Sequence, residues 1–298
     1  MAPEQPEPSV GTDEVEDERQ TTPFLVLQFF IFPMSIVAVC VAVFVVFGLI
    51  ASEGKSAQGY LDEVRTGSMN RRWQAAFELS KVLQAGDDPA LHDDRFVSET
   101  VSLFEAVVDD DPRVQRFLAL ALGRLGDARA VAALATASRE SGDPETRIYA
   151  VWALGAIADP AAVPDLVALS EDEDAGVRKT ACHALGSFSA AQAQAALAAR
   201  LQDGVADVRW NAAIALGRRG DPRAQPELLR MLDREWMGRV PDLTPPQLEA
   251  AMTEAVVAAG HVDDPEIRAA LKKLRGSDPN LSLREAARVA LAAPAEES

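Results

Sequence analysis

The sequence contains few of the residues from which proteins build metal and redox sites. Its 298 residues include two cysteines and three histidines. Cys40 and Cys182 are too few for a disulfide framework, and we expect Cys182, at a small-residue position of a helix, to be a buried thiol. His92, His183 and His261 lie far apart and have no HExxH spacing, so no metal site is predicted.

Signatures of common catalytic chemistry are also missing. The sequence has no glycine-rich phosphate loop, no cysteine cluster with zinc spacing and no serine or cysteine nucleophile motif. We therefore predict no catalytic residue, no cofactor and no enzymatic activity. A formal net charge of −17 also argues against nucleic-acid binding, which depends on Lys and Arg that neutralise phosphates.

One long segment contains no charged residue at all. It runs from Phe24 to Ile50, which is 27 residues. A helix of that length spans ~40 Å, more than the ~30 Å of a bilayer core. The segment follows an acidic leader and is about twice as long as a signal-peptide core, so we predict a permanent transmembrane helix over 23–51.

The charges on either side of this segment predict its orientation. Arg19 precedes it, whereas four basic residues follow it, so the positive-inside rule places the C-terminal side in the cytoplasm. We therefore expect a single-pass protein of a bacterial inner membrane. Residues 1–22, rich in Pro, Glu and Asp, are predicted to be a disordered acidic tail, residues 52–69 a juxtamembrane connector and residues 294–298 a second disordered tail.

What the chain does contain is an internal repeat. VRKTACHALG, residues 177–186, has close copies at 146–155 and 208–217 and a looser one at 114–123. A period of about thirty residues is typical of stacked repeats. Apolar residues follow one face of a helix in each copy, and a second amphipathic pattern follows a turn. Each unit is therefore predicted to be a helical hairpin.

Aspartates stand at the ends of these helices. Their side-chain oxygens can accept hydrogen bonds from the free N–H groups of a helix start, so we predict a structural role. They are Asp111, Asp143 and Asp174 before the first helices, and Asp127, Asp159 and Asp221 after them.

The pattern Asp-x-x-Val-Arg-x-x-Ala-x-x-Ala-Leu-Gly, followed by a turn and a second helix, resembles the HEAT-like repeat, particularly the variant typified by phycobilisome lyases. The resemblance covers roughly residues 70–293. It implies an all-α, right-handed α-α superhelix of about six hairpins with a terminal capping helix, here preceded by the transmembrane helix. That repeat family includes scaffolds, chromophore lyases, hydroxylases and DNA glycosylases, so the fold does not fix an activity. The His-Glu iron ligands expected of the hydroxylases are absent.

Arginine recurs at the second position of the repeat, in Arg147, Arg178 and Arg209. The resemblance implies a ladder between neighbouring repeats in which each guanidinium meets aspartate or carbonyl oxygens, with Asp143 and Asp174 as candidate acids. A ligand-binding role remains the alternative, because the guanidinium fork suits carboxylates.

Large apolar residues offer candidate partner-binding positions. Trp236 and Met237 stand in an insertion bounded by Pro and Gly, and we predict that they anchor a partner. The alternative is that this loop folds onto its own solenoid. Trp152 and Trp210 are further candidates, for which core packing is the alternative.

These observations favour a membrane-anchored scaffold or adaptor, a non-catalytic subunit or assembly factor of a membrane complex. Phe24 to Ile50 would bind the lipid bilayer, and a groove lined by the second helices would bind a protein partner. The acidic surface would attract a basic segment of that partner. The alternative, suggested by the resemblance alone, is a chromophore-lyase-like enzyme or regulator. The sequence predicts no oligomeric state.

Overall fold

The computed structural model describes residues 31–51, 55–86, 88–108 and 111–292. The chain divides into two compact units, Met1–Lys55 and Ser56–Ser298.

The described part of the first unit is a single helix, α2, Phe32–Ala51, whose sequence contains no charged residue. All side chains described in this unit are exposed, including Phe44 at 82%. Counted over the residues that the structure describes, no helix has both the length and the hydropathy of a membrane span. The predicted transmembrane helix lies partly outside those residues, and the predicted tails at 1–22 and 294–298 lie outside them entirely.

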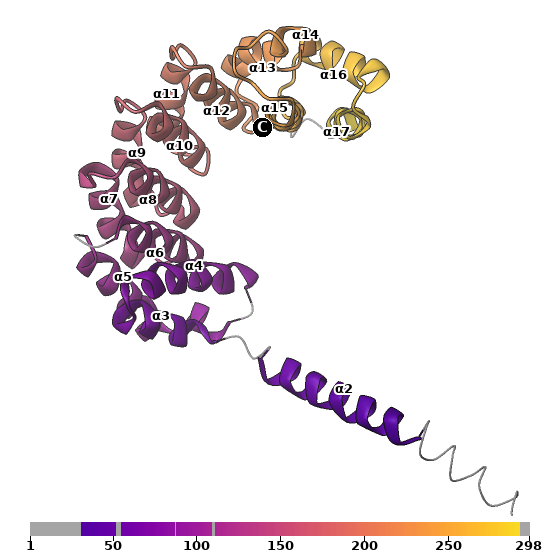
Figure 1. Cartoon of the computed structure of the whole chain (residues 1–298). Helices are drawn as coiled ribbons and strands as arrows, with labels where there is room; N and C mark the ends of the chain where they lie inside the picture. The colour runs from indigo at the N-terminus through magenta and orange to yellow at the C-terminus, as the bar shows by residue number, and fades with distance from the viewer. Residues whose placement is uncertain (1–30, 52–54, 87, 109–110, 293–298) are drawn as a thin grey trace, which may run out of the picture. The chain divides into compact units, whose positions relative to one another are not determined.

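The second unit is an all-helical repeat solenoid, with no strand among its described residues (Figure 1). Its α-helices are α3 Ala57–Thr66, α4 Met69–Ala85, α5 Asp94–Ala106, α6 Pro112–Leu125, α7 Val131–Glu140, α8 Pro144–Ile157, α9 Val163–Leu169, α10 Ala175–Leu185, α11 Ala191–Arg200, α12 Ala206–Gly217, α13 Gln225–Met231, α14 Arg234–Met237, α15 Pro245–Ala259, α16 Pro265–Ser277 and α17 Leu281–Ala292. Short 3₁₀ turns join several of them: η2 Pro89–His92, η3 Ala128–Ala130, η4 Pro160–Ala162 and η5 Pro222–Ala224.

The helices form successive hairpins, as the repeat period predicts. In the regular part of the chain α6 packs with α4, α5 and α8, α8 with α7 and α10, and α10 with α9 and α12. The leucine before each closing glycine is fully buried, as in Leu122, Leu154, Leu185 and Leu216. Burial of a leucine contributes about 1.5–3 kcal/mol, so the repeated leucines are a main source of stability. Helix α17 packs on α15 and α16 as a terminal half unit.

The solenoid begins earlier than the sequence pattern indicated. Residues 52–69 were expected to be a connector, but α3 occupies 57–66 and buries Ala57, Leu61 and Val64. The Ser56 hydroxyl accepts from the Gly59 N–H at 3.3 Å and caps the helix start. These apolar residues follow the spacing of one helix face, so α3 belongs to the packed repeats.

The predicted aspartate caps are confirmed. Asp143 accepts from the Thr146 N–H at 2.8 Å, and Asp174 from the Val177 N–H at 3.0 Å. The aspartates after the first helices cap the 3₁₀ turns in the same way, as Asp159 does for the Ala161 N–H at 2.8 Å. These side chains therefore define where each helix begins.

The first helices of the hairpins approach one another very closely. A Cβ added at Gly155 would lie 2.6 Å from the Ala184 Cβ and 2.7 Å from its Cα, so only glycine fits there without a shift. The same contact recurs at every junction that has a closing glycine. The pairs are Gly123 with Ala153, Gly155 with Ala184, Gly186 with Ala215, Gly217 with Ala258 and Gly260 with Ala290. The repeated glycine is thus a packing requirement of the stack.

This close approach determines which helices form the inner side of the curve. Within the solenoid, α4, α6, α8, α10, α12 and α15 lie on the inner side, and α5, α7, α9, α11 and α13 lie on the outer side (Figure 1). The prediction that the second helices line the groove is therefore wrong. Small residues allow the first helices to crowd together, and the second helices, which contact one another much less, diverge.

Candidate functional site

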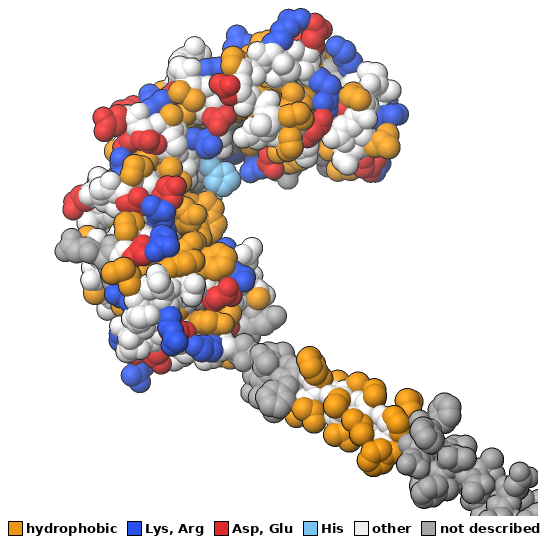
Figure 2. Space-filling model, in the orientation of Figure 1, with side chains coloured by type: hydrophobic (Ala, Val, Ile, Leu, Met, Phe, Trp, Pro, Cys, Tyr) orange, Lys and Arg blue, Asp and Glu red, His pale blue; other side chains and the backbone are white. Residues whose placement is uncertain are grey.

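The inner surface of the solenoid carries a continuous row of aromatic side chains. Phe117 on α6 lies at its centre, with ring centroids 5.1 Å from Phe77 and 6.5 Å from Trp73, both on α4. On the other side the Tyr149 ring of α8 meets Phe117 edge-on at 6.4 Å. We call these residues, together with Trp152, the aromatic row. Figure 2 shows hydrophobic side chains gathered on this side of the solenoid.

Two cations lie over the rings of the aromatic row. The Arg113 guanidinium is 4.6 Å from the Trp73 ring centroid, and the Lys81 ammonium is 5.2 Å from that of Phe77. Both cations also form ion pairs, Arg113 with Asp111 at 2.6 Å and Lys81 with Glu78 at 3.0 Å. These contacts hold long side chains along the edge of the row and leave ring faces between them partly open.

Trp152 and Trp210 differ in the way the structure places them. Trp152 is half-buried on α8. Its ring lies against Gly123, because a Cβ added to that glycine would be only 2.9 Å from the ring. It therefore packs on the stack and still reaches the inner surface. Trp210 is 4% exposed, and its indole nitrogen has no hydrogen-bond partner. Trp210 is thus a core residue, and it is unavailable as a partner contact.

The insertion after α13 folds onto its own solenoid. Met237 is fully buried and Trp236 is half-buried against the core, so the prediction that Met237 anchors a partner is wrong. Arg234 holds this segment through Glu249 at 2.6 Å and Asp278 at 2.7 Å. Pro and Gly interrupt the helical pattern here, so the sequence of the segment resembles that of an exposed loop. In the structure these ion pairs hold the segment against α15 and the end of α16.

The arginines of the second repeat position connect neighbouring hairpins. Arg178 donates to Asp203 at 2.9 and 3.1 Å and to the Asp172 carbonyl at 2.8 Å. Arg147 donates to the Ser138 carbonyl at 3.0 Å and pairs with Asp172. The first of the two candidate acids, Asp143, meets Arg116 instead, and Asp174 caps α10.

Arg209 forms the third contact of this kind. It donates to the Asp203 carbonyl at 2.8 Å and to Glu227 at 3.1 Å. We call each such arginine with its carboxylate a rung. The rung arginines are 15–20% exposed in their side chains, and each donates at least two hydrogen bonds within the protein. All three arginines therefore have structural contacts, as the repeat resemblance implied.

A further cation–carboxylate contact joins α6 to the start of α8. Arg116 donates to the two Asp143 oxygens at 2.6 and 2.7 Å and also pairs with Glu145. The hydrogen bonds from Arg116 lower the pKa of Asp143 to about 2, and those from the Thr146 hydroxyl and N–H add to the effect. Asp143 therefore keeps its charge at any physiological pH.

The middle of the inner surface is polar. His183 on α10 has an exposed side chain. Neighbouring atoms nevertheless shield part of its imidazole from water, which lowers its pKa, and the positive charge of Arg218 lowers the pKa further. The neighbouring Cys182 is buried, and burial raises its pKa to about 12. A thiol in that state is unreactive at neutral pH, which confirms the prediction of a buried thiol. Within the described residues no group of three or more His, Cys, Asp or Glu side chains is placed to hold a metal ion.

Comparisons with known proteins agree with this architecture. Models of HEAT repeats match residues 136–208 and 168–240, and a model of the PBS lyase HEAT-like repeat matches 114–140. The chain therefore contains HEAT-like repeats, as the sequence pattern predicted. A search of curated proteins found no match.

Several solved structures are similar to this chain. The complex of CpcE and CpcF of phycocyanin lyase from Nostoc sp. PCC7120 is 20% identical over 81% of this chain and 89% of that chain, with a TM-score of 0.55. Human deoxyhypusine hydroxylase in complex with glycerol is 23% identical over 79% and 94%, with a TM-score of 0.34. Computationally designed armadillo repeat proteins for modular peptide recognition are 18% identical over 80% and 99%, with a TM-score of 0.39. At these identities the likeness concerns the fold alone.

Proposed function

We propose that this protein is a non-catalytic scaffold that binds a protein partner along the inner surface of its solenoid and is held at a membrane by residues 24–50. The observation that carries the binding proposal is the aromatic row. Aromatic side chains and arginine dominate the energetic centres of protein interfaces, and curved repeat stacks present extended surfaces for partners.

The exposure of the row supports this proposal. Phe77 is 38% exposed although it touches Phe117, and Trp73, Tyr149 and Trp152 are each only half-buried. A stack that needed these rings only for its own core would bury them fully, as it does Phe96 and Phe104. Rings that are fixed by neighbours on one side and open on the other lose little entropy when a partner covers them.

The membrane proposal rests on the sequence from Phe24 to Ile50 and on the composition of α2. A helix that is apolar on all sides needs either a protein core or lipid around it. Every described side chain of α2 is exposed, so within this chain nothing described provides that core. By the positive-inside rule, the basic residues that follow favour a solenoid on the cytoplasmic side of the membrane.

The chromophore-lyase alternative rests on the likeness of fold and repeat. A shared fold does not fix an activity. The scaffold is therefore the function that we propose.

Site-directed photocrosslinking in the intact membrane tests the binding proposal. A photoreactive amino acid replaces Phe77 or Trp152 on the inner surface, and Ala168, an exposed residue of the outer helix α9, serves as the matched control. Both inner positions should crosslink to the same protein, and position 168 should not. Capture of that protein from position 168 as efficiently as from the inner positions would contradict the proposal.

Membrane attachment is tested separately. Alkaline carbonate should leave the full chain in the membrane pellet, and deletion of residues 1–55 should release a helical domain into the soluble fraction. Extraction of the full chain by carbonate would contradict the anchor and leave the crosslinking result unaffected.

A further inference from the structure

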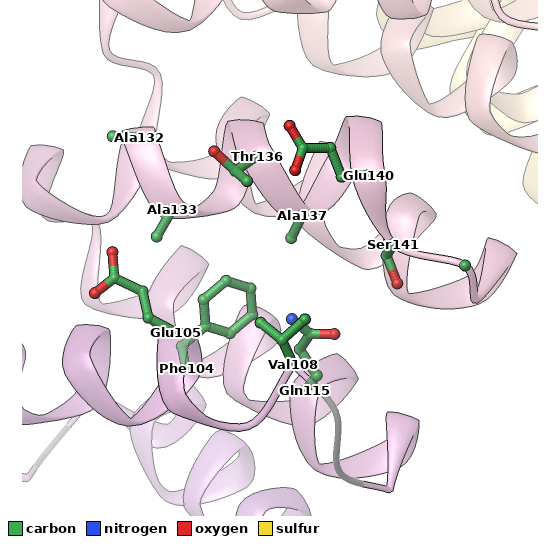
Figure 3. Close-up of a pocket in the computed structure, with 11 residues that line it drawn as sticks. Phe104, Glu105, Val108, Gln115, Ala132, Ala133, Thr136, Ala137, Glu140 and Ser141 are labelled. Atoms are coloured by element: carbon green, nitrogen blue, oxygen red, sulfur yellow. The ribbon is translucent and has the colours of Figure 1, made fainter.

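A pocket of about 570 Å³ opens on the outer side of the solenoid, between α5, α7 and the start of α6 (Figure 3). Its volume is within the range of ligand-binding pockets. Its lining includes Phe104, Glu105 and Val108 from α5 and the residues after it, Gln115 from α6, and Glu140 and Ser141 at the end of α7.

The pocket occupies the position where the next repeats have a rung. Gln115 stands at the second repeat position, which is Arg147, Arg178 and Arg209 in the three repeats that follow. Ser141 lies five residues before Thr146, which occupies the first repeat position. In the next two repeats Asp172 lies five residues before Val177, and Asp203 lies five residues before Val208. The pair corresponding to Arg147 with Asp172 is therefore Gln115 with Ser141. These shorter, uncharged side chains do not close the gap that a guanidinium closes elsewhere.

Three polar side chains at this gap, Gln115, Glu105 and Glu140, have no partner among the described residues, whereas the Ser141 hydroxyl accepts from the Asp143 N–H at 3.3 Å. Gln115 is only 4% exposed, and no described residue forms a hydrogen bond with its amide, which lies beside Phe104 and Val108 (Figure 3). Neither Glu105 nor Glu140 forms an ion pair with a described residue, and no Lys or Arg lines the pocket. The Gln115 amide atoms are reached by solvent through the pocket, so a donor that enters the pocket can replace water there.

We propose that this pocket binds an arginine side chain from a basic segment of a partner protein, which supplies the missing guanidinium of the rung. The guanidinium would donate to the Gln115 carbonyl oxygen, the Ser141 hydroxyl and the Glu140 carboxylate. Its aliphatic stem would lie against Phe104 and Val108, the latter 60% exposed. Three rungs in the same molecule show that this fold accommodates a guanidinium at that position with its donors satisfied.

Charge supports an arginine side chain over a neutral one. The two carboxylates at the pocket are unopposed, and the whole chain has a formal net charge of −17. A basic segment is therefore steered toward the surface and meets uncompensated negative charge at the pocket. This site opens on the outer side of the solenoid, whereas the aromatic row lies on the inner surface, so it does not depend on the function proposed above.

Binding of a short peptide to the full chain, purified in a mild detergent, tests the proposal. The probe is acetyl-Gly-Arg-Gly-amide, followed by saturation-transfer NMR over a concentration series. The matched control replaces arginine with citrulline, which has the same shape and no charge. The arginine peptide should bind at least about tenfold more tightly. Equal binding of the two peptides, or no saturation transfer to either, would overturn the proposal.

Two variants locate the binding site. Glu140→Gln alters only an exposed side chain and should weaken binding of the arginine peptide about tenfold. Gln115→Arg with Ser141→Asp restores the rung and should abolish binding while circular dichroism shows unchanged helicity. Persistent binding by this rung-restoring variant would overturn the proposal, and so would an unchanged affinity in Glu140→Gln, which needs no refolding of the core.

A second probe distinguishes the source of the guanidinium. n-Butylguanidinium has the same stem and head group but no peptide backbone. The peptide should bind at least as tightly as this small molecule. Clearly tighter binding of butylguanidinium would indicate a small-molecule site and overturn the assignment to a partner protein.

Discussion

The inner surface differs between its two halves although both are built on the same repeat. At the fourth position of the repeat helix, α6 and α8 carry Phe117 and Tyr149, whereas α10 and α12 carry Thr180 and Asn211. The first half therefore presents rings, and the second presents hydroxyl and amide groups. The backbone contacts beneath are alike, because a closing glycine meets an alanine of the next first helix in both halves.

This difference separates two kinds of sequence position. Positions that face the next helix are restricted to glycine, alanine or leucine by the space available. Positions that face the interior of the curve are free to vary, so their variation is where a binding preference can reside. The predictions below test this separation.

The largest effect is expected where the first helices are closest. In Gly155→Ala the new methyl group would lie 2.6 Å from the Ala184 Cβ, and backbone atoms of α10 would have to move. We expect a loss of about 2–3 kcal/mol in the free energy of unfolding, measured by chemical denaturation.

Two further glycines calibrate this result. At Gly186 the nearest atom is the His183 carbonyl oxygen at 3.0 Å and the Ala215 Cβ lies at 3.1 Å, so Gly186→Ala should cost less, about 1 kcal/mol. Gly204 has no atom within 4 Å of an added Cβ, so Gly204→Ala should have almost no effect. Equal losses at all three positions would show that helix contact does not control these glycines.

The next largest effect is expected from the carboxylate between α6 and α8. Because the pKa of Asp143 is lowered from 3.8 to about 2, its charge contributes stability that is complete above pH 3.8 and lost as the pH falls through 2. The shift corresponds to about 2 kcal/mol. Asp143→Asn, which keeps a capping side chain, should lose about that much at pH 7 and almost nothing at pH 2 in denaturation experiments.

A related pair in the polar half provides the control, with Asp207 at the repeat position of Glu145. Lys179 occupies the same repeat position as Arg116, and it pairs with Asp207 at 3.3 Å, with both side chains about half exposed. Exposed pairs contribute little, so Asp207→Asn should change the free energy of unfolding by less than about 0.5 kcal/mol at either pH. A loss at Asp207 as large as that at Asp143 would remove this distinction between the halves.

Much of this architecture could be predicted from particular residues. The glycine period predicted the stacked hairpins, and the aspartates predicted the helix starts, because both signals are local. The contacts of Arg178 with Asp203 and with a carbonyl follow the type of ladder that the repeat resemblance implied. The exact acids were less predictable, because their identity depends on where each turn places its side chains.

Other features depended on contacts between distant segments. The fold of the insertion is set by Arg234 reaching Asp278, 44 residues away, and no local pattern predicts that closure. The inner position of the first helices depends on how closely glycine and alanine approach in space. Helix α3 could have been found, because Ala57, Leu61 and Val64 have helical spacing, but its short length resembled a connector. The aromatic row needed the structure, since its rings come from three helices.

The last prediction concerns binding at the fourth repeat position. Once a partner has been identified by crosslinking, Tyr149→Ala should weaken its binding about tenfold, because a half-buried ring at the centre of an interface contributes more than 1 kcal/mol when a partner covers it. Asn211→Ala, at the same position of α12, should leave the affinity unchanged. Titration of the purified partner measures both, with denaturation curves to show that the variants are folded. If Asn211→Ala weakened binding and Tyr149→Ala did not, the polar half would be the contact surface, and the aromatic rings would serve only to hold α4, α6 and α8 together.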